Sequence, residues 1–176
     1  MNSKTLKIDK AEVLAGAKEA FFKALLVGYA KGKKDPKVKS VVTTFSNGKK
    51  VTTEVGNYTV VDEWHTTSFS DYSAGSTTIF LLHNPIWWMS YGGHYPDLAI
   101  PLLKRALSAA YQKHWFFGAR GVKFMDDLES RLYYINDCHG DFNKFCGREE
   151  IHDMGSGPNS GAILGFHEYS GMSFLG

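Results

Sequence analysis

The sequence has little of several features that would point directly to a partner. Its 176 residues carry a formal net charge of only +2 at neutral pH, and its one basic run, residues 31–39, is expected to be a solvated loop. No stretch approaches the roughly 18 consecutive apolar residues that indicate a membrane-spanning helix. We therefore expect neither nucleic acid nor a membrane among the partners.

The chain is also poor in cysteine and lacks an apolar leader. Met1–Lys7 is not followed by the hydrophobic core of a secretory signal, so we expect a cytoplasmic location. In that compartment Cys138 and Cys146 are expected to remain free thiols. Together with His139 and His152 they fit no zinc pattern, because no Cys-x-x-Cys pair is present. The sequence thus predicts no metal site and no cofactor.

Aromatic residues, in contrast, are abundant. Phe, Tyr and Trp make up 14% of the chain, and such side chains build strands, cores and the walls of ligand pockets. The apolar share of 43% is ordinary for a protein with a sizeable core. The length fits one domain, which we predict to span residues 1–176.

Periodicity divides the chain into helical and β-rich parts. Residues 9–30 have helical spacing with Asp9 as the N-cap, and a second helix is expected to begin near Pro96–Asp97. Asn47-Gly48 lies between two β-branched runs, which is a strong hairpin signal. Short turns between strands favour antiparallel pairing and an α+β class. The predicted strands cover residues 41–45, 51–55, 58–65, 77–82, 86–91, 121–125, 131–136 and 162–169.

Three short patterns recur in the same order in the two parts of the chain. They are Tyr58-x-Val60-x-Asp62 with Tyr133-x-Ile135-x-Asp137, Gly75 to Ile79 with Gly147 to Ile151, and Tyr91-x-Gly93 with Tyr169-x-Gly171. We therefore predict internally duplicated units, each a helix followed by an antiparallel β-meander, that share one core. The halves would cover about residues 9–95 and 96–176. A chance match between aromatic-rich strands is the alternative.

The most aromatic stretch contains Trp87, Trp88 and Tyr91. In a strand, Trp87 and Tyr91 would point to one face and Trp88 to the other. A central core strand is one interpretation. The other is the wall of a small-molecule pocket, in which Trp87, Trp88 and Tyr91 would be joined by Tyr169 from the matching C-terminal stretch.

Two acid–histidine pairs are candidates for catalysis. Asp62 precedes His65 in the first half, and Asp137 precedes His139 in the second. A carboxylate beside a histidine fixes its tautomer and favours the imidazolium, as in a general base. Glu149 could join Asp137 as a second carboxylate. The alternative is that these residues cap backbone groups at strand ends.

Two stretches resemble the signatures of an uncharacterised family of domains. They are Pro85-Ile86-Trp87-x-Met89-x-Tyr91-x-Gly93 and Phe145-x-Gly147-x-Glu149-x-Ile151. The resemblance implies membership of a mainly bacterial family, some of whose members follow a helix-turn-helix in transcriptional regulators. It implies a common fold and ligand sensing, and it assigns no chemistry to any residue.

These observations leave three hypotheses. The leading one is a module that binds a small molecule in an aromatic-lined cavity between its two halves. The second is a cofactor-independent enzyme, which requires at least two of the Asp, His and Glu candidates to converge in a cleft. The third is a structural domain that forms a homodimer through sheet edges or aromatic patches.

Overall fold

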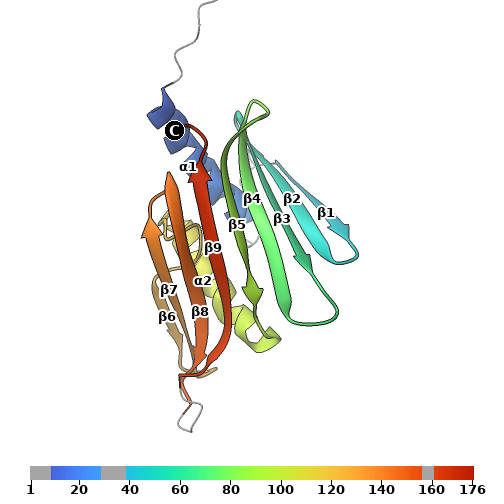
Figure 1. Cartoon of the computed structure of the whole chain (residues 1–176), viewed down its shortest axis with the longest axis vertical. Coiled ribbons are helices and arrows are strands. Elements are labelled where there is room, and N and C mark those ends of the chain that lie inside the picture. The colour runs from blue at the N-terminus through green and yellow to red at the C-terminus, as the bar shows by residue number, and fades with distance from the viewer. Residues whose placement is uncertain (1–8, 29–38, 156–160) are drawn as a thin grey trace, which may run out of the picture.

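The computed structural model describes residues 9–28, 39–155 and 161–176. They form one nine-stranded sheet and two α-helices, which places the chain in the predicted α+β class (Figure 1). The basic run at 31–38 and part of the predicted loop at 155–161 lie outside the described residues. The strands are β1 (Lys39–Phe45), β2 (Gly48–Val55), β3 (Tyr58–Thr66), β4 (Tyr72–Leu81), β5 (Asn84–His94), β6 (Phe124–Asp127), β7 (Leu132–Gly140), β8 (Lys144–Asp153) and β9 (Ile163–Ser173).

Every strand pairs antiparallel with its neighbours, in the order β1-β2-β3-β4-β5-β9-β8-β7-β6. The first five strands are one meander and the last four are another. The two meanders meet where β5 pairs with β9, with Tyr91 directly opposite Tyr169. The last strand in the sequence is therefore central in the sheet.

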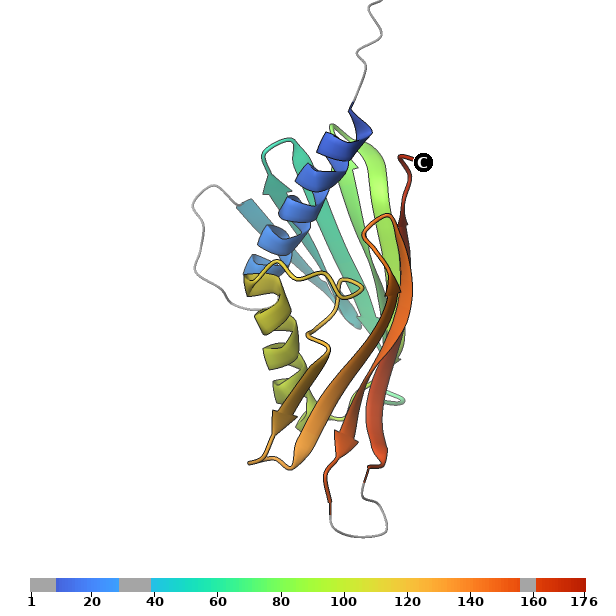
Figure 2. The same ribbon diagram turned by 90° about the vertical axis from the view of Figure 1, so that its left-hand side faces the viewer.

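The first helix, α1 (Lys10–Gly28), begins where the sequence predicts. Asp9 caps it, because its Oδ1 accepts hydrogen bonds from the backbone N–H groups of Ala11 (3.0 Å) and Glu12 (3.2 Å). The second helix, α2 (Ile100–Gln112), follows a short 3₁₀ turn at Asp97–Ala99, and Pro101 lies in its first turn, where no backbone donor is needed. Figure 2 shows both helices on the same, concave side of the curved sheet.

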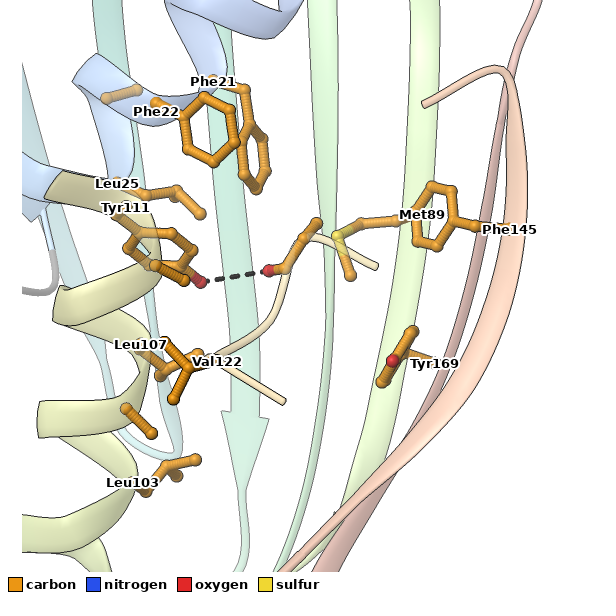
Figure 3. Packing of buried hydrophobic residues seen from close by; sticks show 14 of the residues in the cluster. Phe21, Phe22, Leu25, Met89, Leu103, Leu107, Tyr111, Val122, Phe145 and Tyr169 are labelled. Carbon is orange, nitrogen blue, oxygen red and sulfur yellow. Dashed lines mark hydrogen bonds between the residues drawn. The ribbon is translucent and has the colours of Figure 1, made fainter. Parts of the chain in front are cut away.

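The core lies between the helices and this concave face (Figure 3). Phe21 of α1 packs against Trp87 of β5, whose ring is stacked on Phe142 at 4.8 Å. The indole Nε1 of Trp87 donates to the backbone oxygen of Phe142 (2.8 Å), so the buried side chain has no unsatisfied polar atom. This end of the concave face is filled with aromatic side chains.

The structure departs from the predicted strands in two places. β8 was not predicted as a strand, because Gly147, Arg148, Glu149 and Glu150 all have low β-propensity. Its charged residues are accommodated because alternate positions face opposite sides of the sheet. β4 also begins at Tyr72, five residues before the predicted start, within a segment rich in Ser and Gly.

The register also corrects one of the sequence repeats. Tyr58, Val60 and Asp62 share a face with the buried core, whereas Asp137 is exposed and lies on the opposite face of its strand from buried Asn136. The match between Asp62 and Asp137 is therefore one residue out of phase. Asn136 is the residue of β7 that faces the interior as Asp62 does in β3.

Candidate functional site

A cavity of about 350 Å³ lies between strands β3–β5 and helix α2. Apolar side chains form most of its inner wall, and they are Leu25, Met89, Ile100, Leu103, Leu107 and Ala119. Aromatic rings also line it, from Trp64, Tyr72, Tyr91, Tyr95 and Tyr111. Its volume is at the small end of the range of about 300–1,000 Å³ that is typical of ligand pockets.

Asp62 of β3 is a buried carboxyl group in this wall, with 9% of the residue exposed. Its Oδ1 accepts two hydrogen bonds, from the hydroxyl of Thr77 (2.8 Å) and from the hydroxyl of Tyr91 (3.1 Å). No hydrogen bond to Oδ2 is formed within the described residues. No fully buried side-chain oxygen there lacks a partner, so Oδ2 is accessible, and Asp62 lines both this cavity and a smaller pocket beside Val51 and Val60. Burial raises the pKa of Asp62, and this effect outweighs the hydrogen bonds and the charge of Arg120, which lower it.

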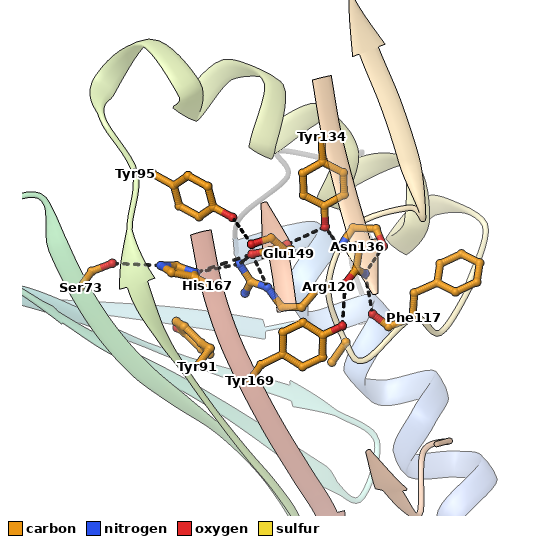
Figure 4. Close-up of polar contacts among 12 residues, drawn as sticks. Ser73, Tyr91, Tyr95, Phe117, Arg120, Tyr134, Asn136, Glu149, His167 and Tyr169 are labelled. Carbon is orange, nitrogen blue, oxygen red and sulfur yellow. Dashed lines mark hydrogen bonds and ion pairs between the residues drawn. The ribbon is translucent and has the colours of Figure 1, made fainter. Parts of the chain in front are cut away.

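Arg120 lies at the inner end of the cavity, on the segment that joins α2 to β6. Its guanidinium forms a buried ion pair with Glu149 of β8, and its Nε donates to Oε1 at 2.8 Å (Figure 4). Tyr134 donates its hydroxyl to the other oxygen, Oε2, at 2.6 Å. Burial opposes the charge of Glu149, but the charge of Arg120, the interaction with His167 and the hydrogen bonds from Arg120 together hold the pKa of Glu149 at about 2.

His167 of β9 links this ion pair to the cavity. Nη2 of Arg120 lies 3.2 Å from its Nδ1, and Oγ of Ser73 lies 3.3 Å from its Nε2. Arginine can only donate, so Nδ1 of His167 accepts this hydrogen bond. The hydrogen-bond network therefore assigns a neutral ring with its proton on Nε2. Burial lowers the pKa of His167, which agrees with the neutral form. With the proton on Nε2, Nδ1 does not donate to Oε1 of Glu149, which lies 3.6 Å away.

Two tyrosines on the concave face each lie across a glycine on the neighbouring strand. Tyr91 pairs with Gly75, and a Cβ at Gly75 would be 2.6 Å from the tyrosine hydroxyl. Tyr169 pairs with Gly147 in the same way. The hydroxyl of Tyr169 donates to Oδ1 of Asn136 at 2.6 Å. Glycine is needed at both positions because a side chain would occupy the space of the ring.

The four residues of the predicted ligand wall lie in different environments. Tyr91 lines the cavity. Trp87 is fully buried in the aromatic core, and Trp88 is on the opposite face of β5. Tyr169 is buried under the segment that joins α2 to β6, where Gly118 contacts its ring. The structure thus brings only Tyr91 of this set to the cavity.

The acid–histidine candidates do not converge in one cleft. His65 is three residues from Asp62, which places it on the other face of β3, where its side chain is 62% exposed and lies near Glu63. Asp137 and His139 are 3.5 Å apart, but their side chains are 80% and 74% exposed on the convex face. Glu149 faces the interior and is engaged by Arg120. Of the five candidates, only Asp62 lines the cavity.

Sequence reasoning did not select Arg120, His167 or Tyr95. Arg120 lies in a segment with no periodic pattern, and His167 has partners 47 and 94 residues away in the chain. The hydroxyl of Tyr95 is 3.4 Å from the backbone oxygen of Glu149, and the ring packs edge-on against His167 at 4.8 Å. The only local signal was a charged residue, Arg120, surrounded by aromatic and glycine residues.

The described part of the chain was predicted to hold no metal and to span no membrane. No group of three or more His, Cys, Asp or Glu residues there is arranged to hold a metal ion. None of the helices there is both long enough and apolar enough to cross a membrane. Cys138 and Cys146 are both free thiols, and Cys146 is exposed.

Comparison with known proteins gives a family and no activity. No curated protein matches the chain, and no solved structure matches it. The matching family profile spans more than half of the sequence, from β3 to the beginning of β9, and includes Asp62, Arg120 and Glu149. Through this match over residues 62–165, the chain belongs to the family described as Domain of unknown function (DUF5680).

Proposed function

We propose that this protein binds a small molecule in the cavity between β3–β5 and α2. The observation that carries the proposal is a cavity of about 350 Å³ whose wall is mainly apolar but which exposes an oxygen of the buried Asp62. An apolar wall with a few convergent polar groups is the usual composition of a ligand site. The apolar part would contribute affinity and Asp62 would orient the ligand.

The surroundings support binding in a fixed orientation. Arg120, Glu149 and His167 hold one another through buried contacts, so the inner end of the cavity is preorganised. Thr77 and Tyr91 fix the orientation of the Asp62 carboxyl group. A ligand therefore meets polar groups that are already positioned, and fewer side chains lose freedom on binding.

The test is a thermal-shift screen of a metabolite library with a matched pair of variants. A ligand stabilises the folded state by mass action, so a hit raises the melting temperature with the logarithm of its concentration. Ser73→Phe places a ring in the cavity, because Ser73 lies on its wall beside His167. Ser76→Phe is the control, since Ser76 is on the same strand but the opposite face. Hits should be lost in Ser73→Phe and kept in Ser76→Phe. Equal shifts in both variants would contradict the proposal.

A second candidate function is proton transfer by Asp62. A carboxyl group with a raised pKa in an apolar cavity is suited to act as a general base or acid. The test is to incubate each screening hit with the protein in D₂O and follow its C–H signals by NMR. Exchange that requires the wild-type protein and is absent in Asp62→Asn would support catalysis. No exchange in any hit would leave binding alone.

We also propose that the chain is internally duplicated, with the phase corrected by the sheet register. Tyr91 over Gly75 and Tyr169 over Gly147 are the matching pairs, and each hydroxyl reaches a residue that faces the interior, Asp62 or Asn136. The two tyrosines lie opposite each other across β5 and β9, where a pseudo-two-fold axis would pass. An experimental structure in which the two tyrosine–glycine pairs did not superpose about this axis would contradict the duplication.

A further inference from the structure

We propose that the ligand is a cationic amine with an apolar body, and that Oδ2 of Asp62 binds its ammonium group. This inference rests on the proposed binding function and specifies its ligand class. It is based on the charge of the cavity wall, on the hydrogen bonds of Asp62 and on the aromatic rings nearby.

The first argument is the balance of charge in the described wall. Three carboxyl groups line the cavity, from Asp62, Asp71 and Asp97, and the only guanidinium or ammonium group is that of Arg120. The charge of Arg120 is balanced by Glu149, which is fully buried and lies behind the wall. His167 is neutral in its hydrogen-bond network, so acidic groups outnumber basic groups in the described wall.

The second argument concerns the hydrogen bonds that Asp62 can still accept. Its Oδ1 already receives hydrogen bonds from Thr77 and Tyr91, and these hold the carboxyl group in place. Its Oδ2 receives none of the hydrogen bonds formed within the described residues and is accessible, and in the ionised carboxylate it can only accept. A ligand must therefore present a donor, and a charged donor forms the stronger hydrogen bond. An anionic ligand would bring a second negative charge to a poorly hydrated site.

The third argument is the aromatic surface around the entrance. Asp71 and Asp97 are exposed, and the rings of Tyr72 and Trp64 line the cavity with them. Carboxylates at an entrance raise the local concentration of cations, and the faces of Tyr and Trp attract them further. Arg120 repels such a ligand less than a free guanidinium would, because Glu149 balances its charge. The deeper apolar wall then receives the body of the molecule.

The experiment compares three probes of one shape: 3-phenylpropylamine, 3-phenyl-1-propanol and 3-phenylpropionate. Binding is measured by titration calorimetry at neutral pH. The amine should bind about tenfold more tightly than the alcohol, or more, and the carboxylate least. Amine binding no stronger than alcohol binding, or no amine binding up to millimolar concentration, overturns the inference.

Variants place the effect at Asp62. In Asp62→Asn the amide oxygen can still accept from Thr77 and Tyr91, so the fold is retained while the charge is removed. The affinity for the amine should fall about tenfold while that for the alcohol changes little. Asp137→Asn is the matched control, since that carboxylate is exposed on the convex face. An unchanged preference for the amine in Asp62→Asn overturns the inference, and circular dichroism confirms that each variant is folded.

The design separates the two proposals. If the alcohol or the carboxylate binds best and Ser73→Phe abolishes that binding, the cavity is the ligand site but the ligand is not an amine. If all three probes and all library hits bind equally well to Ser73→Phe, the proposed site itself is wrong. Amine binding that is lost in both Ser73→Phe and Asp62→Asn supports both.

Discussion

The two halves of the concave face have the same tyrosine-over-glycine arrangement but differ in what covers it. Over the first half, Tyr91 and Asp62 face the cavity. Over the second half, the segment 113–123 lies on the sheet, with Gly118 against Tyr169 and the backbone of Gly121 hydrogen-bonded to Tyr134. Among the described residues, the second half is therefore covered by a chain segment and the first half borders a cavity.

The two halves also differ in the side chain that accepts from the tyrosine hydroxyl, which is Asp62 in the first half and Asn136 in the second. The amide of Asn136 donates from Nδ2 to the backbone oxygens of Phe117 and Gly121, both at 3.0 Å, and so holds segment 113–123 in place. A carboxylate at the same level cannot donate. Asp62 therefore cannot bind backbone oxygens as Asn136 does, and it lies in the wall of the cavity.

The largest loss of stability is expected from breaking the ion pair of Arg120 and Glu149, which lies in the half that segment 113–123 covers (the closed half). Arg120→Met should lower the free energy of unfolding by about 3–5 kcal/mol, because Glu149 would remain buried without its partner. Urea denaturation measures this value. Arg105→Met is the control, since Arg105 pairs with Asp127 at the surface and should contribute at most about 1 kcal/mol. The double variant Arg120→Met/Glu149→Leu should recover part of the loss. Equal effects of the two arginine variants would contradict the assigned role of burial.

Exchanging the amide for a carboxylate should open the closed half. Asn136→Asp loses two donated hydrogen bonds and buries a charge, so we expect a loss of about 3 kcal/mol. Amide hydrogen exchange should also become faster in segment 113–123. The matched exchange, Asp62→Asn, should leave protection in that segment unchanged. Protection that persists in Asn136→Asp would show that the amide does not hold the segment.

Acid should destabilise the closed half through Glu149. Its pKa is lowered from 4.5 to about 2, so the stability that it contributes is present above pH 4.5 and is lost as the pH falls towards 2. The expected loss is about 3 kcal/mol, from a shift of roughly two units. Denaturation of wild type and Glu149→Gln from pH 6 to pH 2.5 measures it. The variant starts less stable but should lose less over this range. Parallel curves would argue against a charged Glu149.

Alanine substitutions at Gly75 and Gly147 compare the space available to Tyr91 and to Tyr169. Gly147→Ala forces Tyr169 against Asn136 and the covering segment, so overpacking should cost about 3 kcal/mol. At both positions a Cβ would also meet a backbone oxygen of the adjacent strand, of Glu63 or of Asp137. Gly75→Ala should still cost less, about 2 kcal/mol, because Tyr91 can move into the cavity. Thermal unfolding of the two variants gives the comparison. A larger loss in Gly75→Ala would mean that the space beside Tyr91 is not available.

The smallest change in stability is expected at Asp62. Its pH dependence has the opposite sign to that of Glu149, because the pKa of Asp62 is raised and that of Glu149 is lowered. Burial raises the pKa of Asp62 above its usual 3.8, so its ionisation opposes folding. The stability that its neutral form contributes is complete below about pH 3.8 and is lost as the pH rises through the raised pKa. Asp62→Asn should not show this loss, and near neutral pH it should be at least as stable as wild type. A less stable variant at neutral pH would contradict this sign.

The sequence predicts what depends on local pattern. Both helices, the Asn47-Gly48 hairpin and most strands follow from periodicity and turn chemistry, and the structure contains them. The sequence does not predict the strand β8, because a charged residue such as Glu149 is compatible with a buried strand face only through its partner Arg120, which lies elsewhere in the sequence. Asp62 was selected for chemistry, but its predicted partner His65 is an odd number of residues away and therefore faces the other side. The contacts of Arg120 and His167 join distant strands, which no local pattern records.

The position of β9 has a consequence for how the protein folds. It follows the other eight described strands in the sequence, yet it forms the seam between β5 and β8. Until it is available, the edges of β5 and β8 are unpaired, and each edge is a template for the wrong strand. Pairing across this seam joins residues far apart in sequence, which slows folding. The order of synthesis thus leaves the centre of the sheet until last, and during that interval the chain is most exposed to aggregation.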